Sequence, residues 1–171
     1  MGPAVSFFVG ALTLLVVRNQ FALGLRPFLS YSSKWVESRN ESVYLTRAPG
    51  GVWTVDVRNS GSGIGIIRAV SIMVSCDGSP EFSGDYEEVV NYLQSCGLQL
   101  NREYAISKIS PGGVLAKDGE VRIFELTHGA STKFDTLTVS VEFEGALKDT
   151  YSKMIYCIPP QGLPPLPQQQ S

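Results

Sequence analysis

Residues 137–144, LTVSVEFE, alternate strictly between apolar and polar side chains. Successive side chains of a β-strand point to opposite faces of the sheet. The apolar members of this stretch therefore share one face: Leu137, Val139, Val141 and Phe143. The period of two predicts a strand with one buried and one solvated face, which is typical of an antiparallel sheet.

Further stretches with strand character lie on both sides of this one, separated by Gly, Asn, Asp and Pro residues that favour turns. We predict strands at 52–58, 64–75, 103–109, 121–126 and 151–158. The side chains expected in the core are Trp53, Val55, Ile66, Val70, Ile72, Val139, Val141 and Phe143, with Arg68 as an exception on its strand. This pattern favours a mainly all-β fold, an antiparallel Ig-like β-sandwich of about seven strands.

One short inserted helix is expected between residues 85 and 96. The sequence Asp85-Tyr86-Glu87-Glu88 resembles a capping box, whose first and last side chains bond to the backbone of the first helical turn. The apolar residues that follow at helical spacing are Tyr86, Val89, Val90 and Leu93. Gly97 supplies the stop, and we expect the helix to lie across an end or edge of the sandwich.

The chain begins with an apolar segment over residues 4–17, AVSFFVGALTLLVV. A helix over residues 2–17 would span roughly 24 Å, slightly less than the ~30 Å hydrocarbon core of a bilayer. We predict an N-terminal membrane helix within an anchor over residues 1–25, with residues 4–25 in contact with membrane lipid. Two alternatives stay open: a signal peptide cleaved near Ala22-Leu23-Gly24, and a buried core helix.

The charges that flank this segment bear on its orientation. No Lys or Arg precedes the segment, and four basic residues follow it closely: Arg18, Arg26, Lys34 and Arg39. Basic residues favour the cytoplasmic side of a membrane. We therefore expect a single-pass membrane protein whose domain faces the cytoplasm, with an extracytoplasmic or secreted domain as the alternative.

The rest of the chain divides into three parts. Residues 26–43 form a polar juxtamembrane connector, with a short helix expected around residues 34–39. Residues 44–158 hold the predicted β-sandwich domain. Residues 159–171 are rich in Pro and Gln and are expected to be a disordered tail. The tail contains PPLP at 164–167, a PxxP spacing that SH3-like domains bind, but no flanking basic residue.

The three cysteines are Cys76, Cys96 and Cys157, and none belongs to a CxxC pair. Either all three are buried thiols, or two form a disulfide and the third stays free. A bridge between Cys76 and Cys96 would close a loop of about 20 residues. Because the expected orientation places the domain in the reducing cytoplasm, we predict free thiols at all three positions.

Candidate catalytic and ligand-binding residues are sparse. The enzymatic alternative is a membrane-associated hydrolase using the lone histidine, His128, with Asp135 or Cys157. The Gly61-x-Gly63-x-Gly65 run lacks the following helix that a dinucleotide-binding loop needs, and it favours a strand connection. The net charge is −2, whereas nucleic-acid binders normally carry a basic face. We expect no catalytic, cofactor-binding or metal residues, and neither a cofactor nor a nucleic-acid partner.

The two tryptophans lie in different surroundings. Trp53 alternates with valines and is expected in the core. Trp35 lies in the connector near basic residues, which favours a place at the membrane interface. An aromatic platform for carbohydrate is the alternative for Trp35.

These features resemble a loose group of uncharacterised bacterial membrane proteins with an N-terminal anchor and a small Ig-like domain. The residues that carry the resemblance are Arg26-Pro27-Phe28-Leu29, Val55 to Asn59 with Gly61-x-Gly63, Ile66-Ile67-Arg68-Ala69-Val70, Ile109-Ser110-Pro111-Gly112 and the paired final strands. The chain departs from the group at Gly63-Ile64-Gly65, where the group more often has Gly-Pro-Ala. The resemblance implies the fold and the anchoring, and it supplies no activity and no site residues.

An anchor, a sandwich and the lack of a convergent cluster of titratable residues in the sequence together favour a membrane-anchored, non-catalytic interaction module. Such a module binds a protein partner. A place as an accessory subunit of a larger assembly fits this expectation, and the hydrolase built on His128 is the alternative.

Overall fold

The computed structural model describes residues 17, 20, 24–37, 39–159 and 162–165 of the 171-residue chain. The anchor predicted over residues 1–25 lies almost entirely outside these described residues. Within them, no helix combines the length and the apolar character needed to cross a membrane.

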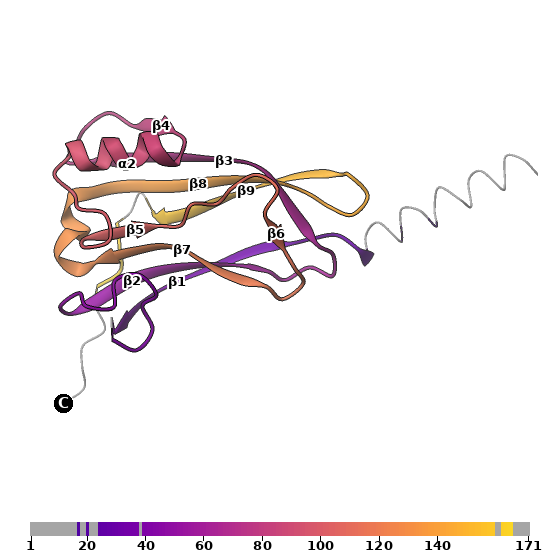
Figure 1. Cartoon of the computed structure of the whole chain (residues 1–171), viewed down its shortest axis with the longest axis horizontal. Coiled ribbons are helices and arrows are strands. Elements are labelled where there is room, and N and C mark those ends of the chain that lie inside the picture. Colours follow the sequence, from indigo (N-terminus) through magenta and orange to yellow (C-terminus); the bar gives the residue numbers. More distant parts are fainter. Residues whose placement is uncertain (1–16, 18–19, 21–23, 38, 160–161, 166–171) are drawn as a thin grey trace, which may run out of the picture.

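The described elements follow one another along the chain as strands with two short helices. They are β1 (Leu29–Glu37), β2 (Gly51–Asn59), β3 (Gly65–Cys76), β4 (Phe82–Gly84), α2 (Tyr86–Ser95), β5 (Tyr104–Ile106), β6 (Val114–Leu115), β7 (Glu120–Thr127), the 3-10 helix η1 (His128–Lys133), β8 (Phe134–Glu144) and β9 (Thr150–Ile158). The strands form two antiparallel sheets that pack as a sandwich (Figure 1). One sheet has the order β1-β2-β7-β5, and the other has the order β4-β3-β8-β9 with β6 also paired to β3. The predicted mainly-β sandwich with one short helix is confirmed.

The core lies between the two sheets, where the alternating strands meet face to face. Six of the eight side chains predicted for the core are 4% exposed or less: Trp53, Val55, Ile72, Val139, Val141 and Phe143. Side chains of both sheets belong to one apolar cluster. The strand alternation therefore predicted the buried face of β2 and β8 correctly.

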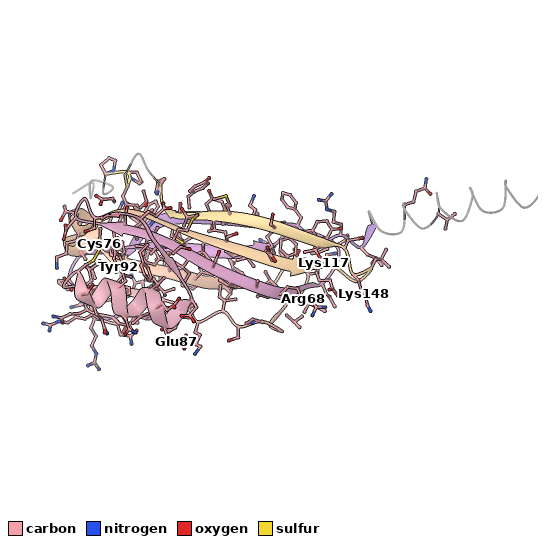
Figure 2. All side chains as sticks on the ribbon, turned by 90° about the horizontal axis from the view of Figure 1, so that it is seen from above. Arg68, Cys76, Glu87, Tyr92, Lys117 and Lys148 are labelled. Atoms are coloured by element: carbon pink, nitrogen blue, oxygen red, sulfur yellow. A yellow bond between two sulfur atoms is a disulfide. The ribbon has the colours of Figure 1, made fainter. Side chains whose placement is uncertain are left out.

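The other two predicted core residues, Ile66 and Val70, are only half-buried. The pairing of β3 with β8 shifts register between Ile67 and Ala69, where β3 contains a bulge. An extra residue inverts the faces of a strand, so Ile67 packs against the core before the bulge and Val70 does so after it. The prediction that Ile66 shares the inner face was wrong for this reason. Arg68 is exposed and pairs with Glu144, and Figure 2 shows it at the same end of the sandwich as Lys117 and Lys148.

Residues 29–37 form strand β1, which pairs with β2 along its whole length from Leu29↔Asn59 to Glu37↔Gly51. The short helix predicted around residues 34–39 was therefore wrong, and the sandwich begins near residue 29 rather than 44. The polar composition of residues 29–37 does not look like that of a buried strand, because β1 lies at the edge of its sheet. An edge strand tolerates Ser and Lys side chains that a central strand would exclude.

Glu125 organises the loop that connects β1 to β2. Its carboxylate is fully buried and accepts hydrogen bonds from the Ser42 hydroxyl at 2.7 Å and from three consecutive backbone N–H groups at 2.7–3.0 Å, those of Val43, Tyr44 and Leu45. Arg122 donates to the same carboxylate at 2.7 Å and also pairs with Asp56. A carboxylate on β7 therefore holds the loop against the sheet.

The inserted helix is confirmed as α2, which begins with the predicted capping box. The Asp85 side chain accepts from the Glu88 N–H, and the Glu88 side chain accepts from the Asp85 N–H. Gly97 follows the helix at a φ of 77°, a backbone conformation that side chains disfavour. Phe82 on β4 stacks on Tyr92 with ring centroids 4.7 Å apart, and the helix packs on β3 and β4.

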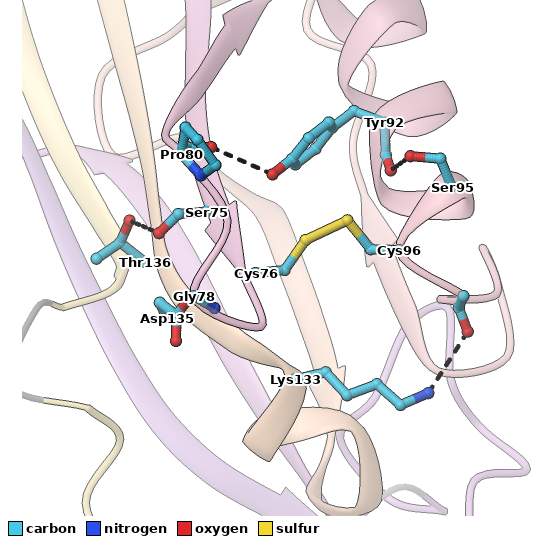
Figure 3. The surroundings of a disulfide bond; sticks show 11 residues. Ser75, Cys76, Gly78, Pro80, Tyr92, Ser95, Cys96, Lys133, Asp135 and Thr136 are labelled. Atoms are coloured by element: carbon cyan, nitrogen blue, oxygen red, sulfur yellow. Dashed lines mark hydrogen bonds between the residues drawn. A yellow bond between two sulfur atoms is a disulfide. The ribbon is translucent and has the colours of Figure 1, made fainter.

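A disulfide joins Cys76, at the end of β3, to Cys96, just after α2 (Figure 3). The two Cα atoms lie 6.9 Å apart. β4 turns back along β3, and α2 packs on both strands, so its last residue lies near the end of β3. The prediction of free thiols was wrong for this pair and is confirmed for Cys157, which is buried. In the chain-entropy model a bridge between residues 20 apart contributes about 3 kcal/mol to the free energy of unfolding.

Candidate functional site, an aromatic groove

A groove of about 790 Å³ lies between the edge strands β1 and β9, where the two sheets end on the same side of the sandwich. The inward side chains of β1 have no strand of the other sheet fully covering them, so aromatic surface stays accessible there. The groove is lined by Tyr31, Ser33, Trp53, Tyr156, Pro159, Gly162, Leu163 and Pro164. We call this site, with Trp35 at its rim, the aromatic groove.

Two tryptophans form the floor and the rim of the aromatic groove. Trp35 and Trp53 are direct partners in the β1–β2 register, and their rings meet edge to face with centroids 5.5 Å apart. Trp53 is buried, and its indole Nε1–H donates to the carbonyl of Cys157 on the opposite sheet at 2.8 Å. Trp53 therefore ties the sheets together, while Trp35 is half-buried and presents its indole to the surface.

The C-terminal segment returns to this groove after β9. The Trp35 indole Nε1–H donates to the carbonyl oxygen of Pro164 at 2.8 Å, and Leu163 packs against the core. In Figure 1 the yellow segment runs from the end of β9 toward the turn between β1 and β2. Residues 162–165 of the predicted disordered tail are thus placed on the sandwich, and residues 166–171 lie outside the described part of the chain.

His128 stands at the start of η1, with its exposed ring against the Trp35 ring at a centroid distance of 5.5 Å. The two groups proposed to act with it have other surroundings. The Asp135 carboxylate accepts a hydrogen bond from the Gly78 N–H at 2.8 Å. The Cys157 thiol is fully buried, and burial raises the pKa of Cys157 far above its ordinary value. The structure therefore places the imidazole beside the aromatic groove, against Trp35, while the Asp135 carboxylate binds the Gly78 N–H and the Cys157 thiol is buried.

A cation lies over the other end of the groove. The Lys153 ammonium is 5.9 Å from the centre of the Tyr31 ring and 5.8 Å from that of Phe28. At these distances a cation is attracted to the face of an aromatic ring. The groove thus has aromatic walls, with one basic group at one end and His128 at the other.

The glycine-rich connection between β2 and β3 supports the sandwich rather than a ligand. A Cβ on Gly61 would lie 2.3 Å from the Phe28 nitrogen, and one on Gly63 would lie 1.6 Å from the Leu25 oxygen. Side chains at either position would collide with the backbone that enters β1. The two glycines therefore permit close backbone packing.

A second hollow of about 210 Å³ lies between the first turn of α2 and residues 106–111. Its walls are largely apolar, and Lys108 pairs with Glu87 at the surface. Among the described residues, no group of three His, Cys, Asp or Glu side chains is arranged to hold a metal ion. The aromatic groove, which gathers accessible aromatics and a bound segment, is the stronger candidate site.

The sequence points to Trp35, Trp53, His128 and the PxxP motif as separate features. The structure brings the first three together with Pro164, the first residue of that motif. Tyr31 and Tyr156 were not predicted as groove residues. The alternation of Tyr31, Ser33 and Trp35 is the signal that would have found the strand and its inner face.

No protein-family model matches the chain, and no curated protein matches it. Among solved structures, the chain is similar to a Bordetella pertussis protein provisionally named ApaA. The two share 13% sequence identity with a TM-score of 0.31, over 76% of this chain and 88% of the other. A likeness at this level carries no inference about function.

Proposed function

We propose that this chain is a membrane-anchored, non-catalytic interaction module, built on an Ig-like sandwich, that binds a protein partner through the aromatic groove. One observation carries the proposal: the groove already holds a peptide segment, residues 162–165, by a hydrogen bond from Trp35 to the carbonyl oxygen of Pro164. Exposed Trp and Tyr side chains are the residue types that most often dominate protein interfaces. The contact between His128 and Trp35 supports a part for this histidine in the interaction surface beside the groove.

The position of the groove suits a module held at a membrane. β1 starts at one end of the sandwich, and Trp35 near its other end lies with the C-terminal segment (Figure 1). With an anchor over residues 1–25, the Trp35 end of the groove would point away from the bilayer. A partner, including a larger assembly with this chain as accessory subunit, would then reach it without contacting lipid.

The disulfide is evidence for which side of the membrane the domain faces. Disulfides persist in oxidising compartments and are rare in the cytoplasm. The pairing of Cys76 with Cys96 therefore supports an extracytoplasmic domain, the alternative to the cytoplasmic side that the distribution of Lys and Arg favours. We propose the extracytoplasmic orientation.

Counting thiols in cells tests this orientation. Cells quenched in acid, denatured and treated with a maleimide before any reduction should yield one adduct per chain, at Cys157, and three adducts after reduction. A Cys157→Ala variant should yield none before reduction. Three adducts in the unreduced wild type would place the domain in a reducing compartment and contradict the proposal.

A site-specific photo-crosslinker tests the groove as an interaction surface. Ser33 is exposed and lines the groove, whereas Ser83 is exposed on β4 at the edge of the other sheet. With the full chain in its native membrane, a crosslinker at 33 should give a discrete adduct with another protein, and one at 83 should not. The adduct should be lost when Trp35→Ala is added.

The same adducts at both positions would mean that the capture is not directed by the groove. The absence of any adduct at 33 would also contradict the proposed function. In both cases the far-ultraviolet circular dichroism spectrum of each purified variant shows whether the sandwich has folded.

A further inference from the structure

We propose that the aromatic groove recognises proline-rich segments in the polyproline II conformation, and that the chain's own C-terminal segment occupies it as an intramolecular competitor. This inference rests on the proposed function and names the class of ligand. It also assigns a regulatory role to the tail, because a partner that takes the Trp35 hydrogen bond must first displace Pro164.

The hydrogen bond at the rim has the chemistry of polyproline recognition. Proline has no backbone N–H, and in a polyproline II helix the carbonyl groups make no internal hydrogen bonds. These carbonyls need donors from outside the segment. An indole N–H donates and cannot accept, and Trp35 directs this group at the Pro164 oxygen at 2.8 Å.

The docked sequence favours the extended conformation before it binds. Proline fixes its own φ near −65°, and it pushes the residue before it toward extended backbone. Leu163 precedes Pro164, and Pro164 precedes Pro165, so two successive residues are restricted in this way. Such a segment loses little conformational entropy on docking, which favours its binding over that of a flexible segment.

The walls of the groove suit proline rings and one larger apolar side chain. Tyr31, Trp53 and Tyr156 line it, and Leu163 reaches the apolar core between the sheets. Grooves lined by aromatic side chains are the usual docking surfaces of proline-rich ligands. The volume of about 790 Å³ lies beside the docked residues, so a ligand bulkier than this segment also fits.

A tethered segment competes strongly because its local concentration is high. A short flexible connection gives an effective concentration on the order of millimolar. The tail leaves β9 at Ile158 and is hydrogen-bonded at Pro164. For a free peptide of the same sequence, occupancy by the tail should weaken apparent binding by about tenfold.

The test measures binding of a labelled peptide to the detergent-solubilised full chain. The peptide carries residues 162–171, GLPPLPQQQS, and its control has Ala in place of each of the three prolines. One protein is the wild type, and the other carries L163D, P164A and P165A to release its tail. We expect the tail variant to bind the proline peptide about tenfold more tightly than the wild type does. The alanine peptide should bind the tail variant at least about tenfold more weakly than the proline peptide.

Two further substitutions in the tail variant test the role of the Trp35 indole N–H as hydrogen-bond donor. Trp35→Phe keeps an aromatic ring and removes the N–H, so peptide binding should fall about fivefold. Tyr92→Phe is the matched control, because the Tyr92 hydroxyl also donates to a proline carbonyl, that of Pro80, but outside the groove. Tyr92→Phe should leave peptide binding unchanged. Circular dichroism should show the same fold for every variant.

Equal binding of the two peptides, or equal binding by the wild type and the tail variant, would overturn the inference. If neither peptide binds while a crosslinker at residue 33 still captures a partner, the groove is an interaction surface without specificity for proline-rich segments. A full chain that is dimeric, and becomes monomeric when the tail is altered, would show that the tail docks on a second copy and would overturn its intramolecular role.

Discussion

Replacing Glu125 with Ala should lower the free energy of unfolding by about 3–5 kcal/mol, because it removes one member of a buried charged pair and leaves buried donors of the β1–β2 loop without an acceptor. The Glu125 carboxylate is fully buried and receives hydrogen bonds from Arg122, from the Ser42 hydroxyl and from the backbone of the β1–β2 loop. Urea unfolding followed by circular dichroism measures the change. Glu120→Ala, an exposed carboxylate on the same strand, should change it by less than about 0.5 kcal/mol.

The Glu125 carboxylate should also make the free energy of unfolding depend on pH in the acidic range. Burial raises the pKa of Glu125, but the hydrogen bonds from Ser42 and from the loop backbone outweigh burial and leave the pKa below its ordinary value of 4.5. The unfolded chain then binds the proton more readily than the folded chain does. The contribution of Glu125 is therefore fully present above about pH 4.5 and is lost as the pH falls through the lower, folded-state pKa. A Glu125→Gln variant should lack this part of the acid sensitivity; an unchanged acid profile would contradict the assignment.

Replacing Phe143 with Ala should also cost about 3–5 kcal/mol, through lost apolar burial and the cavity left in the core. Phe143 is 4% exposed, lies on the inner face of β8 and stacks on Tyr151 with ring centroids 5.5 Å apart. Glu142→Ala is the control, because residue 142 is exposed on the outer face of the same strand. A loss below about 1 kcal/mol for Phe143→Ala would show that the ring is not part of the packed core.

The aromatic groove follows from the way the sandwich ends. A sheet of limited width leaves inward side chains on its edge strand that the opposite sheet does not cover. In this chain β1 supplies two aromatic side chains of this kind, Tyr31 and Trp35. Tyr156, an exposed residue of β9, also lines the opening. Leu163 and Pro164 then cover part of the opening, which explains why a segment with the composition of a disordered tail docks on the fold.

Patterns that depend on near neighbours in the chain were predictable from the sequence. The alternation over residues 137–144 gave the inner face of β8, and the Asp85–Glu88 spacing gave the capping box of α2. Both patterns report local geometry, since strand faces and helix caps are set within a few residues. The bulge at Arg68 was not predictable in this way, because it appears only when β3 is paired with β8.

By itself, the sequence determined the long strands from β2 onward and the helix α2, because these depend on short-range spacing and on residue type. It did not determine β1, β4 or β6. Only the tertiary structure decided which strands became edges, that Cys76 meets Cys96, and that Trp35 meets a segment 129 residues away. A period of two reports the face of a strand and carries no information on its neighbour. Strand order and inter-sheet packing arise from burying all the apolar faces at once, so a groove assembled from both ends of the chain exists only in the folded protein.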